Sequence, residues 1–522
     1  MVSTIHQRPL RSCPTRPDTI NGGALGSTEV TYRRTKGNPT DRLSEASLRL
    51  VIKALRVGAY DFRARFPEEA GPQEAEFLGA AIGRFTRGPF LVGRDTRRES
   101  RLFSKGLIKG LAQSGSSVQE LGIIPTPVAG FEARRLRSVS LVASPSHNAL
   151  GFVGLKAFTS YGRPWGSEWA EFRRALRNHD FVREVREGSL AVRPRRHRDH
   201  MGERELKKWY LKHLSQFGPS PVRVVVDSRG GATSGWASSV IRSNGGVVLE
   251  LNPGQSATFH GLNPEPTLDS LGPLRNAVRR FSASFGVAFD GDGDRAVFVD
   301  ERGVPVPPEA IALCLLDSPE SGRRAIVASA DMSPRLANKV KVHWSKVGGL
   351  NVCKKMELCR ADIGTELSGH YYFKTEGFAS DGILTAVAVA HVTCMVKQPL
   401  SHYVSELGEF NRLIVRIRGP DRRTTIQALH TLQSDHSIEP RRFCGGWIWK
   451  LNSGGSGYAR VSQTEPTIRL VCEGSPQTLQ SLVEDLKADP ALTCLTKGSL
   501  TSRRFRGWSE ADFRLAGDKI LP

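Results

Sequence analysis

The stretch FGVAF-DGDGDR-AVFVD, residues 285–300, decides the fold, because it places an acidic, glycine-rich loop between two apolar segments. Both flanks are rich in Val and Phe, which predicts two β-strands, whereas an EF-hand loop lies between helices. The loop also carries Arg295 at its sixth position, where an EF-hand requires glycine for its turn. The sequence therefore predicts a strand–loop–strand unit and excludes an EF-hand.

The loop itself has the residues of a metal site. Asp290, Asp292 and Asp294 occupy every second position, so their carboxylates converge on one side of the backbone. The glycines between them allow the backbone to wrap around a small ion, and hard oxygen ligands suit magnesium or calcium. Because three aspartates in one loop repel each other, we expect a cation there; a solvated acidic turn is the alternative.

Helix-like and strand-like segments alternate from about residue 70 onward. Pro72–Phe85 has apolar residues at helical spacing, Val139–Ala143 is an apolar strand, and Glu203–Phe217 is helix-like again. A third unit begins with the strand Ala325–Ala328, after which we expect a helix that ends near Val342. Alternation of this kind predicts right-handed βαβ units and mixed or parallel sheets.

The C-terminal part has a different pattern. Arg412–Ile417 and Ile468–Cys472 are strand-like and the helix Thr478–Ala488 follows, which indicates a sheet with helices on one side. The fold class that we expect is α/β, with three similar mixed-sheet domains and a smaller C-terminal α+β domain. We place a basic flexible extension at 1–55, α/β domains at 56–200, 201–304 and 305–408, and the α+β domain at 409–522.

Composition limits the class of protein. Lys and Arg number 74 against 52 Asp and Glu, but the chain has no zinc-finger, RNA-binding or leucine-zipper pattern, so nucleic acid is not expected as the main partner. The eight cysteines form no C-x-x-C pair, and no apolar signal region follows Met1, which favours a cytoplasmic protein. A misassigned start codon and a weak transit signal stay open. The longest apolar run, Ile383–Val396, is too short to span a bilayer and predicts a buried helix, so no membrane partner is expected.

Three further segments suit phosphate and sugar chemistry, although each is also compatible with an ordinary loop. Ser144-Pro-Ser-His-Asn148 follows a strand, where ligands of α/β sheets bind and where a serine hydroxyl can accept a phosphoryl group. Gly364-Thr-Glu-Leu-Ser-Gly-His370 offers a carboxylate and a hydroxyl to sugar hydroxyls, and an imidazole to a phosphate or a proton. Arg460-Val-Ser-Gln-Thr-Glu-Pro466 joins an Arg fork with hydroxyls, which suits a phosphate group.

Together with the acidic loop, and in the same order, these segments resemble the four signature loops of the α-D-phosphohexomutases, most closely the bacterial phosphomannomutase/phosphoglucomutase branch. The resemblance spans about residues 56–485. Further matching segments are Tyr60-Asp-Phe-Arg63, Gly93-Arg-Asp-Thr-Arg97, Pro125-Thr-Pro127, Asn263-Pro-Glu-Pro266 and Asp381-Gly382.

The resemblance implies four domains around a central cleft and an isomerase that interconverts hexose 1-phosphate and hexose 6-phosphate, with mannose or glucose as the sugar. The reaction would pass through a phosphoserine and a 1,6-bisphosphate intermediate. Mg²⁺ is the implied cofactor, glucose 1,6-bisphosphate or an equivalent the implied activator, and small-molecule sugar phosphates the partners of an expected monomer.

The resemblance also implies roles for individual residues. The implied catalytic group comprises the phosphoserine Ser146 with His147, Lys156, Arg295, Arg63 and His370. Magnesium would be held by Asp290, Asp292, Asp294 and the Ser146 oxygen. The substrate would be bound by Tyr60, Glu366, Ser368, Arg460, Ser462, Gln463 and Thr464. Among these, Lys156 would take part in proton transfer, and Glu366 and Ser368 would contact the 3- and 4-hydroxyls of the sugar.

Several positions depart from the family pattern. Gly349 stands where relatives often have histidine, and Ser329–Pro334 has no lysine where the bifunctional enzymes often do. These departures put the preferred sugar and the turnover in doubt. Two alternatives therefore stay open: a phosphoglucosamine mutase, and a catalytically impaired relative with a binding or regulatory role.

Overall fold

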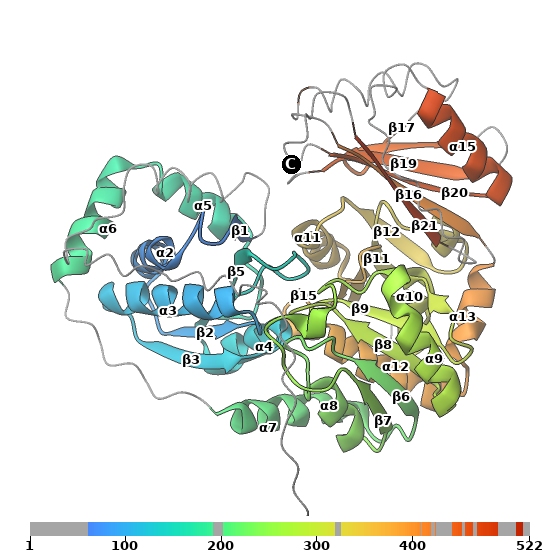
Figure 1. Cartoon of the computed structure of the whole chain (residues 1–522), viewed down its shortest axis with the longest axis horizontal. Coiled ribbons are helices and arrows are strands. Elements are labelled where there is room, and N and C mark those ends of the chain that lie inside the picture. The colour runs from blue at the N-terminus through green and yellow to red at the C-terminus, as the bar shows by residue number, and fades with distance from the viewer. Residues whose placement is uncertain are drawn as a thin grey trace, which may run out of the picture. The chain divides into compact units, whose positions relative to one another are not determined.

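The computed structural model describes residues 61–191, 202–318, 325–408, 410–418, 423, 441–450, 455–462, 467–488 and 508–514 (Figure 1). All of them belong to one unit, Leu43–Pro522. The extension expected at 1–55 lies outside the described residues, as do Tyr60, Gln463 and Thr464. The described chain forms four sheets, three of mixed α/β type and one near the C-terminus, which confirms the expected fold class.

The first sheet has the strand order β1-β5-β4-β2-β3. Its strands are β1 (Phe62–Arg65), β2 (Phe90–Arg94), β3 (Val118–Ile123), β4 (Val139–Ala143) and β5 (Phe152–Phe158). Its helices are α2 (Pro72–Phe85), α3 (Arg98–Gln113), α4 (Thr126–Leu136), α5 (Ser167–Ala175) and α6 (His179–Ala191). In α3, Phe103, Leu107 and Leu111 recur at a spacing of four and are fully buried, so one apolar stripe holds this helix in the core.

The second sheet has the order β10-β9-β8-β6-β7. Its strands are β6 (Arg223–Asp227), β7 (Val247–Leu251), β8 (Phe285–Phe289), β9 (Ala296–Asp300) and β10 (Pro305–Val306). Its helical segments are α7 (Glu203–Leu214), η1 (Ser215–Phe217), α8 (Ala237–Ser243), η2 (Phe259–Gly261), η3 (Leu268–Leu271) and α9 (Gly272–Phe281). The strand–loop–strand unit predicted around the acidic loop is β8 and β9, which pair antiparallel.

The third sheet has the order β12-β11-β13-β14-β15. Its strands are β11 (Ala325–Ser329), β12 (Lys341–Ser345), β13 (Ile363–Thr365), β14 (Tyr371–Phe373) and β15 (Ala379–Ser380). Its helical segments are α10 (Pro308–Leu316), η4 (Pro334–Asn338), α11 (Gly349–Cys359), η5 (Lys374–Glu376), α12 (Gly382–Val396) and α13 (Leu400–Leu407). Figure 1 shows α11 running beside β11 and β12.

The helix expected to end near Val342 was wrong, because Val342 lies in β12 and only the short η4 precedes it. Val342 and Trp344 alternate in the sequence with Lys341 and His343, and this period of two is that of a strand. The buried helix predicted over Ile383–Val396 is confirmed as α12, most of whose residues are buried.

One topology recurs in all three sheets. Each has three parallel strands followed in space by two antiparallel ones, namely β3-β2-β4 with β5 and β1, β7-β6-β8 with β9 and β10, and β12-β11-β13 with β14 and β15. Three of the candidate loops occupy the same place in this plan. Each follows the third parallel strand, β4, β8 or β13, and leads into its antiparallel partner.

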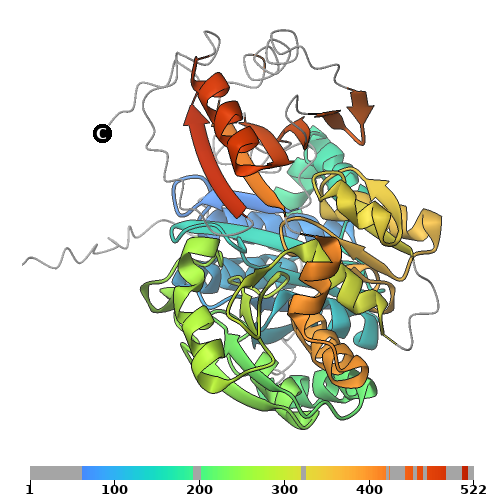
Figure 2. The same ribbon diagram turned by 90° about the vertical axis from the view of Figure 1, so that its right-hand side faces the viewer.

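The fourth sheet has the order β17-β18-β19-β20-β16-β21. Its elements are β16 (Asn411–Arg418), β17 (Arg441–Phe443), β18 (Gly446–Lys450), β19 (Ser456–Val461), β20 (Thr467–Gly474), α15 (Pro476–Ala488) and β21 (Trp508–Arg514). All pairs are antiparallel except β16 with β21. Figure 2 shows α15 lying along this sheet, where Leu479 joins its core.

Within the described part of the chain, no single helix has the length and apolar character of a membrane span. One pair, α12 with α13, meets both criteria when counted together, but the two helices meet at a bend of 90°.

Candidate active site

Ser146 lies in the loop between β4 and β5 with its hydroxyl aimed at the acidic loop. Its Oγ donates a hydrogen bond of 2.7 Å to Oδ2 of Asp290, and the side chain is almost fully buried. The backbone of Ser146 has a φ of 56°, in the left-handed region that a non-glycine residue adopts at a cost of about 1–2 kcal/mol. A strained backbone of this kind needs support from its surroundings.

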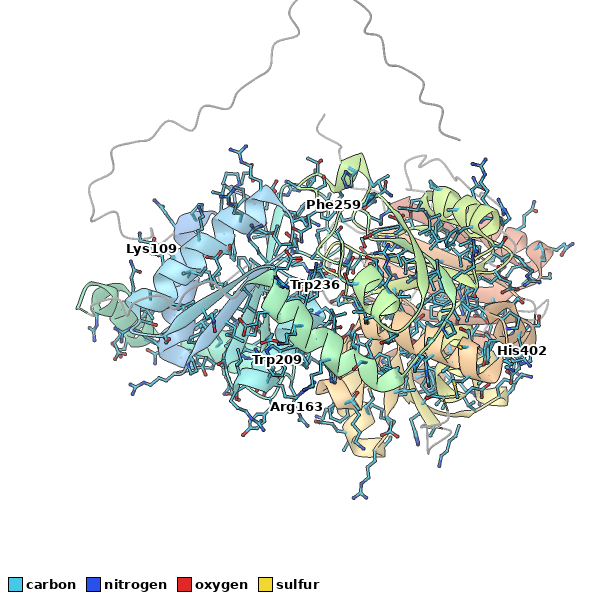
Figure 3. All side chains as sticks on the ribbon, turned by 90° about the horizontal axis from the view of Figure 1, so that it is seen from below. Lys109, Arg163, Trp209, Trp236, Phe259 and His402 are labelled. Carbon is cyan, nitrogen blue, oxygen red and sulfur yellow. The ribbon has the colours of Figure 1, made fainter. Side chains whose placement is uncertain are left out.

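Arg97 provides that support. Its guanidinium donates to the backbone carbonyls of Ser146, Asn148 and Ala149 at 2.6, 2.6 and 2.7 Å. It also lies 3.2 Å from the Asp95 carboxylate and 5.0 Å from the centre of the Phe259 ring, which Figure 3 labels. One buried arginine therefore holds the serine loop at three points.

Asp95 acts on the same loop through a second residue. Its Oδ2 accepts a hydrogen bond of 2.9 Å from the Ser144 hydroxyl, which in turn accepts one of 2.9 Å from the Ser146 backbone N–H. Asp95 and Ser144 are fully buried. This chain fixes the direction in which the Ser146 side chain leaves the loop.

The acidic loop approaches Ser146 closely. Asp290, Asp292 and Asp294 each place a carboxylate oxygen within 4.8 Å of the others. A Cβ atom on Gly291 would lie 2.9 Å from the Ser146 carbonyl oxygen, so a side chain there would push the two loops apart. The serine and the three carboxylates are thus gathered at one point.

A hard cation fits this group of oxygens. Asp290 and Asp292 are fully buried, and Oδ1 of Asp292 accepts no hydrogen bond from any described residue. Burial and the charge of Asp294 raise the pKa of Asp290 well above its ordinary value. Burial also acts to raise the pKa of Asp294, but Lys156 and His370 outweigh it and hold that pKa well below its ordinary value, so the nearby positive charge serves Asp294 more than Asp290. Buried carboxylate oxygens with unused capacity are the ligands that Mg²⁺ and Ca²⁺ bind.

Lys156, on β5, supplies one cation. Its Nζ donates to Oδ2 of Asp292 at 2.7 Å and to Oδ2 of Asp294 at 2.5 Å. Burial lowers the pKa of Lys156, but the aspartates outweigh it and raise the pKa above its ordinary value, so Lys156 is an ammonium ion here. Thr126 adds a neutral donor, with its hydroxyl 2.5 Å from the same Asp292 oxygen.

Arg295 follows the acidic loop and reaches the serine loop. It donates to Nδ1 of His147 at 2.9 Å and to Oε1 of Glu265 at 3.0 Å. Burial and the charge of Arg295 hold the pKa of His147 well below its ordinary value. Because arginine only donates, Nδ1 of this neutral imidazole is the acceptor and Nε2 carries the proton.

The loop Glu366–His370 meets the acidic loop from the third sheet. An isolated antiparallel bridge joins Arg295 to His370, and Nε2 of His370 lies 3.5 Å from Oδ1 of Asp294. Nδ1 of His370 lies 2.8 Å from the hydroxyl of Ser368. Arg63, on β1, contacts Asn148 of the serine loop through its guanidinium.

The structure thus brings together most of the sequence-predicted residues: Ser146, His147, Lys156, Asp290, Asp292, Asp294, Arg295, Glu366, Ser368, His370 and Arg63. Arg460 lies in β19 of the fourth sheet, and Ser462 directly follows this strand, where its backbone N–H donates to the Thr467 carbonyl at 2.7 Å. Burial raises the pKa of Asp331, while the charge of Arg460 opposes that shift.

Sequence reasoning missed several supporting residues. Arg97, Asp95, Thr126 and Glu265 all lie in the short segments that matched the family pattern, but nothing in those segments shows that they hold the serine and acidic loops. Their partners lie 30 to 166 positions away along the chain, at separations where periodicity carries no signal.

Comparison with known families gives three matches in order along the chain. The model for phosphoglucomutase/phosphomannomutase, alpha/beta/alpha domain I, matches residues 54–179, that for domain II matches 205–303, and that for domain III matches 320–410.

Three individual proteins similar to this chain have sequence identities between 13% and 29%. The phosphoglucosamine mutase of Symbiobacterium thermophilum is 29% identical over 433 residues, covering 78% of this chain and 92% of that protein. A phosphoglucomutase/phosphomannomutase family protein from Burkholderia thailandensis superimposes with a TM-score of 0.67 at 21% identity, over 84% of this chain and 97% of that one. The N-acetylphosphoglucosamine mutase of Aspergillus fumigatus, solved with GlcNAc-6P and magnesium, gives a TM-score of 0.51 at 13% identity, over 84% and 98% of the chains.

Proposed function

Because this chain belongs to the α-D-phosphohexomutase superfamily, we propose that it interconverts hexose 1-phosphate and hexose 6-phosphate through a phosphorylated Ser146, with mannose or glucose as the sugar. The observation that carries the proposal is the 2.7 Å contact between the Ser146 hydroxyl and Asp290, within three aspartates whose oxygens lie within 4.8 Å of one another. A hydroxyl in that place suits a group that carries and releases a phosphoryl group.

In the proposed reaction, the bond between phosphorus and Oγ of Ser146 breaks while a bond to the free hydroxyl oxygen of the substrate forms. The proton of that hydroxyl is given up as the new bond forms and one proton returns to Oγ, so Ser146 is left as a free hydroxyl and the sugar becomes a 1,6-bisphosphate. After this intermediate turns around, its other phosphoryl group returns to Oγ and leaves the isomeric monophosphate. Glucose 1,6-bisphosphate, as activator, would phosphorylate enzyme that has lost its phosphoryl group.

The chain's own residues have defined tasks in this scheme. Asp290, Asp292 and Asp294 would hold Mg²⁺, which supplies positive charge that stabilises the transferring phosphoryl group. Arg97 holds the backbone of the serine loop in line for transfer. Arg295 is a permanent cation beside Ser146 through its contact with His147, and Lys156 is a second cation at the aspartates.

Binding of the sugar is assigned to the third and fourth domains. Glu366 and Ser368 would accept and donate hydrogen bonds at the sugar hydroxyls, and His370 lies between them and Asp294. Arg460 and Ser462, together with Thr464 outside the described residues, would bind the phosphate that does not react, and Tyr60 and Gln463, also outside the described residues, are assigned to substrate binding without a more specific role.

A second candidate substrate is glucosamine phosphate. It is favoured by the similarity to the phosphoglucosamine mutase of Symbiobacterium thermophilum, which extends over most of both chains. The segment Glu366–His370 favours mannose or glucose instead, because it resembles that branch of the family.

The test is direct. Purified protein is incubated with Mg²⁺, a trace of glucose 1,6-bisphosphate, and the 1-phosphate of mannose, glucose or glucosamine in turn, while phosphorus NMR follows the 6-phosphate. Conversion of any of the three that is lost in Ser146→Ala supports the proposal, and the relative kcat/KM identifies the sugar. Folded wild-type protein that neither converts a sugar nor incorporates phosphate at Ser146 would instead be the impaired binding relative.

A further inference from the structure

Both carboxylate oxygens of Glu366 are held by donors of the protein itself. The backbone N–H of Gly348 donates to Oε1 at 2.6 Å, and the hydroxyl of Tyr372 donates to Oε2 at 2.6 Å. Only 4% of Glu366 is exposed, so these two contacts fix its orientation with little help from solvent. Each oxygen still has a second lone pair for a ligand hydroxyl.

Tyr372 reaches Glu366 from the apolar interior of the third domain. Tyr372 lies on β14 opposite Gly364 of β13. Its ring packs with three buried residues of α11, namely Val352, Cys353 and Met356. Burial and the negative charge of Glu366 raise the pKa of Tyr372 well above its ordinary value, so its hydroxyl keeps its proton and acts as a donor.

The position of Tyr372 accounts for Gly349, the residue that stands where relatives often have histidine. A Cβ atom on Gly349 would lie 2.7 Å from the Tyr372 hydroxyl oxygen and 3.3 Å from Cε1. The first residue of α11 therefore cannot carry a side chain while the hydroxyl of Tyr372 occupies that space. The glycine and the tyrosine form one unit.

We propose that Tyr372, in the space left by Gly349, is a positioning residue that orients Glu366 toward the sugar hydroxyls and so sets substrate recognition in this chain. The inference rests on the proposed function, because it takes Glu366 as a ligand of the sugar. Tyr372 acts through Glu366 and does not itself touch the substrate.

The first experiment compares Tyr372→Phe with a matched control, Tyr371→Phe. Tyr371 is the preceding residue of β14, is equally buried, and packs its ring against Phe298 on the opposite side of the strand. The probes are the hexose 1-phosphate that the wild type converts best and its 3-deoxy and 4-deoxy analogues.

Tyr372→Phe should lower kcat/KM on the complete sugar about tenfold, the scale of one hydrogen bond to a charged group, mainly through KM. On the analogue that lacks the hydroxyl bound by Glu366, the same change should have less than about a twofold effect. Tyr371→Phe should change kcat/KM by the same factor on all three sugars. An equal loss on all three sugars with Tyr372→Phe would mean a merely structural role and would overturn the proposal.

The second experiment tests whether Gly349 and Tyr372 act as a unit. Gly349→Ala should reduce kcat/KM about as much as Tyr372→Phe, because the new Cβ displaces the hydroxyl. In the Tyr372→Phe background the clash with oxygen is gone, so Gly349→Ala should add less than about a twofold effect. Independent, multiplying effects of the two changes contradict the proposal.

Failure of the proposed function can be told apart from failure of this inference. If the wild type converts no sugar phosphate, the function is wrong, and calorimetric binding of the same sugars to dephosphorylated protein replaces kcat/KM. The expected pattern in Kd is unchanged. The role of Tyr372 is overturned if the wild type binds none of the sugars. It is also overturned if Tyr372→Phe raises Kd by the same factor whether or not the sugar has the hydroxyl bound by Glu366.

Discussion

Two regions of this molecule bury carboxylates beside cations, and they differ in how completely the oxygens are used. At the joint between the third domain and the fourth sheet, Arg412 lies between Glu309 and Glu473. Its guanidinium and the N–H and hydroxyl of Ser333 serve all four carboxylate oxygens. At the acidic loop, by contrast, an oxygen of Asp292 is buried without a hydrogen-bond donor among the described residues.

The difference separates a structural cluster from a functional one. A buried ion pair in which the cation and neighbouring donors reach every carboxylate oxygen is held by the protein alone, and its loss is felt as instability. A buried carboxylate with unused capacity costs stability unless a cation joins it, and so it indicates a binding site. Accumulated acidic residues alone would not have told the two apart.

The largest effect should follow from changing the functional cluster. Asp292→Asn removes a carboxylate from the acidic loop, and we expect turnover to fall about 10⁴-fold, corresponding to roughly 5 kcal/mol of barrier. The thermal midpoint should hold or rise, because a repelling charge is removed. Steady-state kinetics and calorimetry measure the two quantities. Near-normal turnover of Asp292→Asn would show that the acidic loop is not the functional cluster.

Changing the structural cluster should have the reverse pattern. Arg412→Met leaves two buried carboxylates unpaired, and we expect a loss of about 3–5 kcal/mol in the free energy of unfolding with near-normal kcat in the folded fraction. Urea unfolding and kinetics at low temperature measure the two quantities.

The matched control for this change is Lys109→Met. The exposed Lys109 projects outward in Figure 3 and pairs with Glu76, and its change should cost no more than about 1 kcal/mol. Equal losses for the buried and the exposed cation would show that Arg412 has no special structural role.

Removal of the metal should sharpen the comparison further. Mg²⁺ at about a hundred times its Kd should stabilise the wild type by about 2.7 kcal/mol over protein treated with chelator. Asp292→Asn should lose this response and Arg412→Met should keep it, as measured by unfolding with and without Mg²⁺. A response that survives in Asp292→Asn would place the ion elsewhere.

The smallest effect concerns a third buried carboxylate, Glu376, which accepts hydrogen bonds from His213 and Arg134. Burial raises the pKa of Glu376, but these partners outweigh it and hold the pKa below the ordinary 4.5. Since the pKa is lower in the folded state, this stabilisation is present above pH 4.5 and is lost as the pH falls below it. The wild type should exceed Glu376→Gln by about 1–2 kcal/mol at pH 7, and the gap in urea unfolding should close in acid.

The sequence predicted those helices and strands that depend on residues close together in the chain. The strand Val139–Ala143 and the helix Pro72–Phe85 have the bounds that their patterns predicted, and the acidic loop lies between two strands as expected. The strand at Val342 was missed because its alternation is weak beside lysines, and an exposed edge strand needs few apolar residues. Local pattern thus determines most elements.

Contacts between distant segments were beyond the sequence. Arg97 is separated by about fifty positions from the three carbonyls to which it donates. Tyr372 is the second residue after the segment Gly364–His370, and nothing in that segment indicated its contact with Glu366. The three carboxylates could be proposed as ligands from their spacing, but the orientation of Glu366 depends on packing between α11 and β14. Such contacts follow from tertiary structure alone.

The contact between Ser146 and Asp290 joins residues 144 positions apart, in loops that belong to two different sheets. During synthesis the ribosome delivers the serine loop first, and the first domain can fold before the acidic loop has emerged. Synthesis adds roughly 5–20 residues per second. Ser146 of a newly made chain therefore lacks the carboxylates of the acidic loop for some seconds. In the proposed mechanism, phosphoryl transfer could therefore begin only after the second domain has been made, because that domain supplies the three carboxylates.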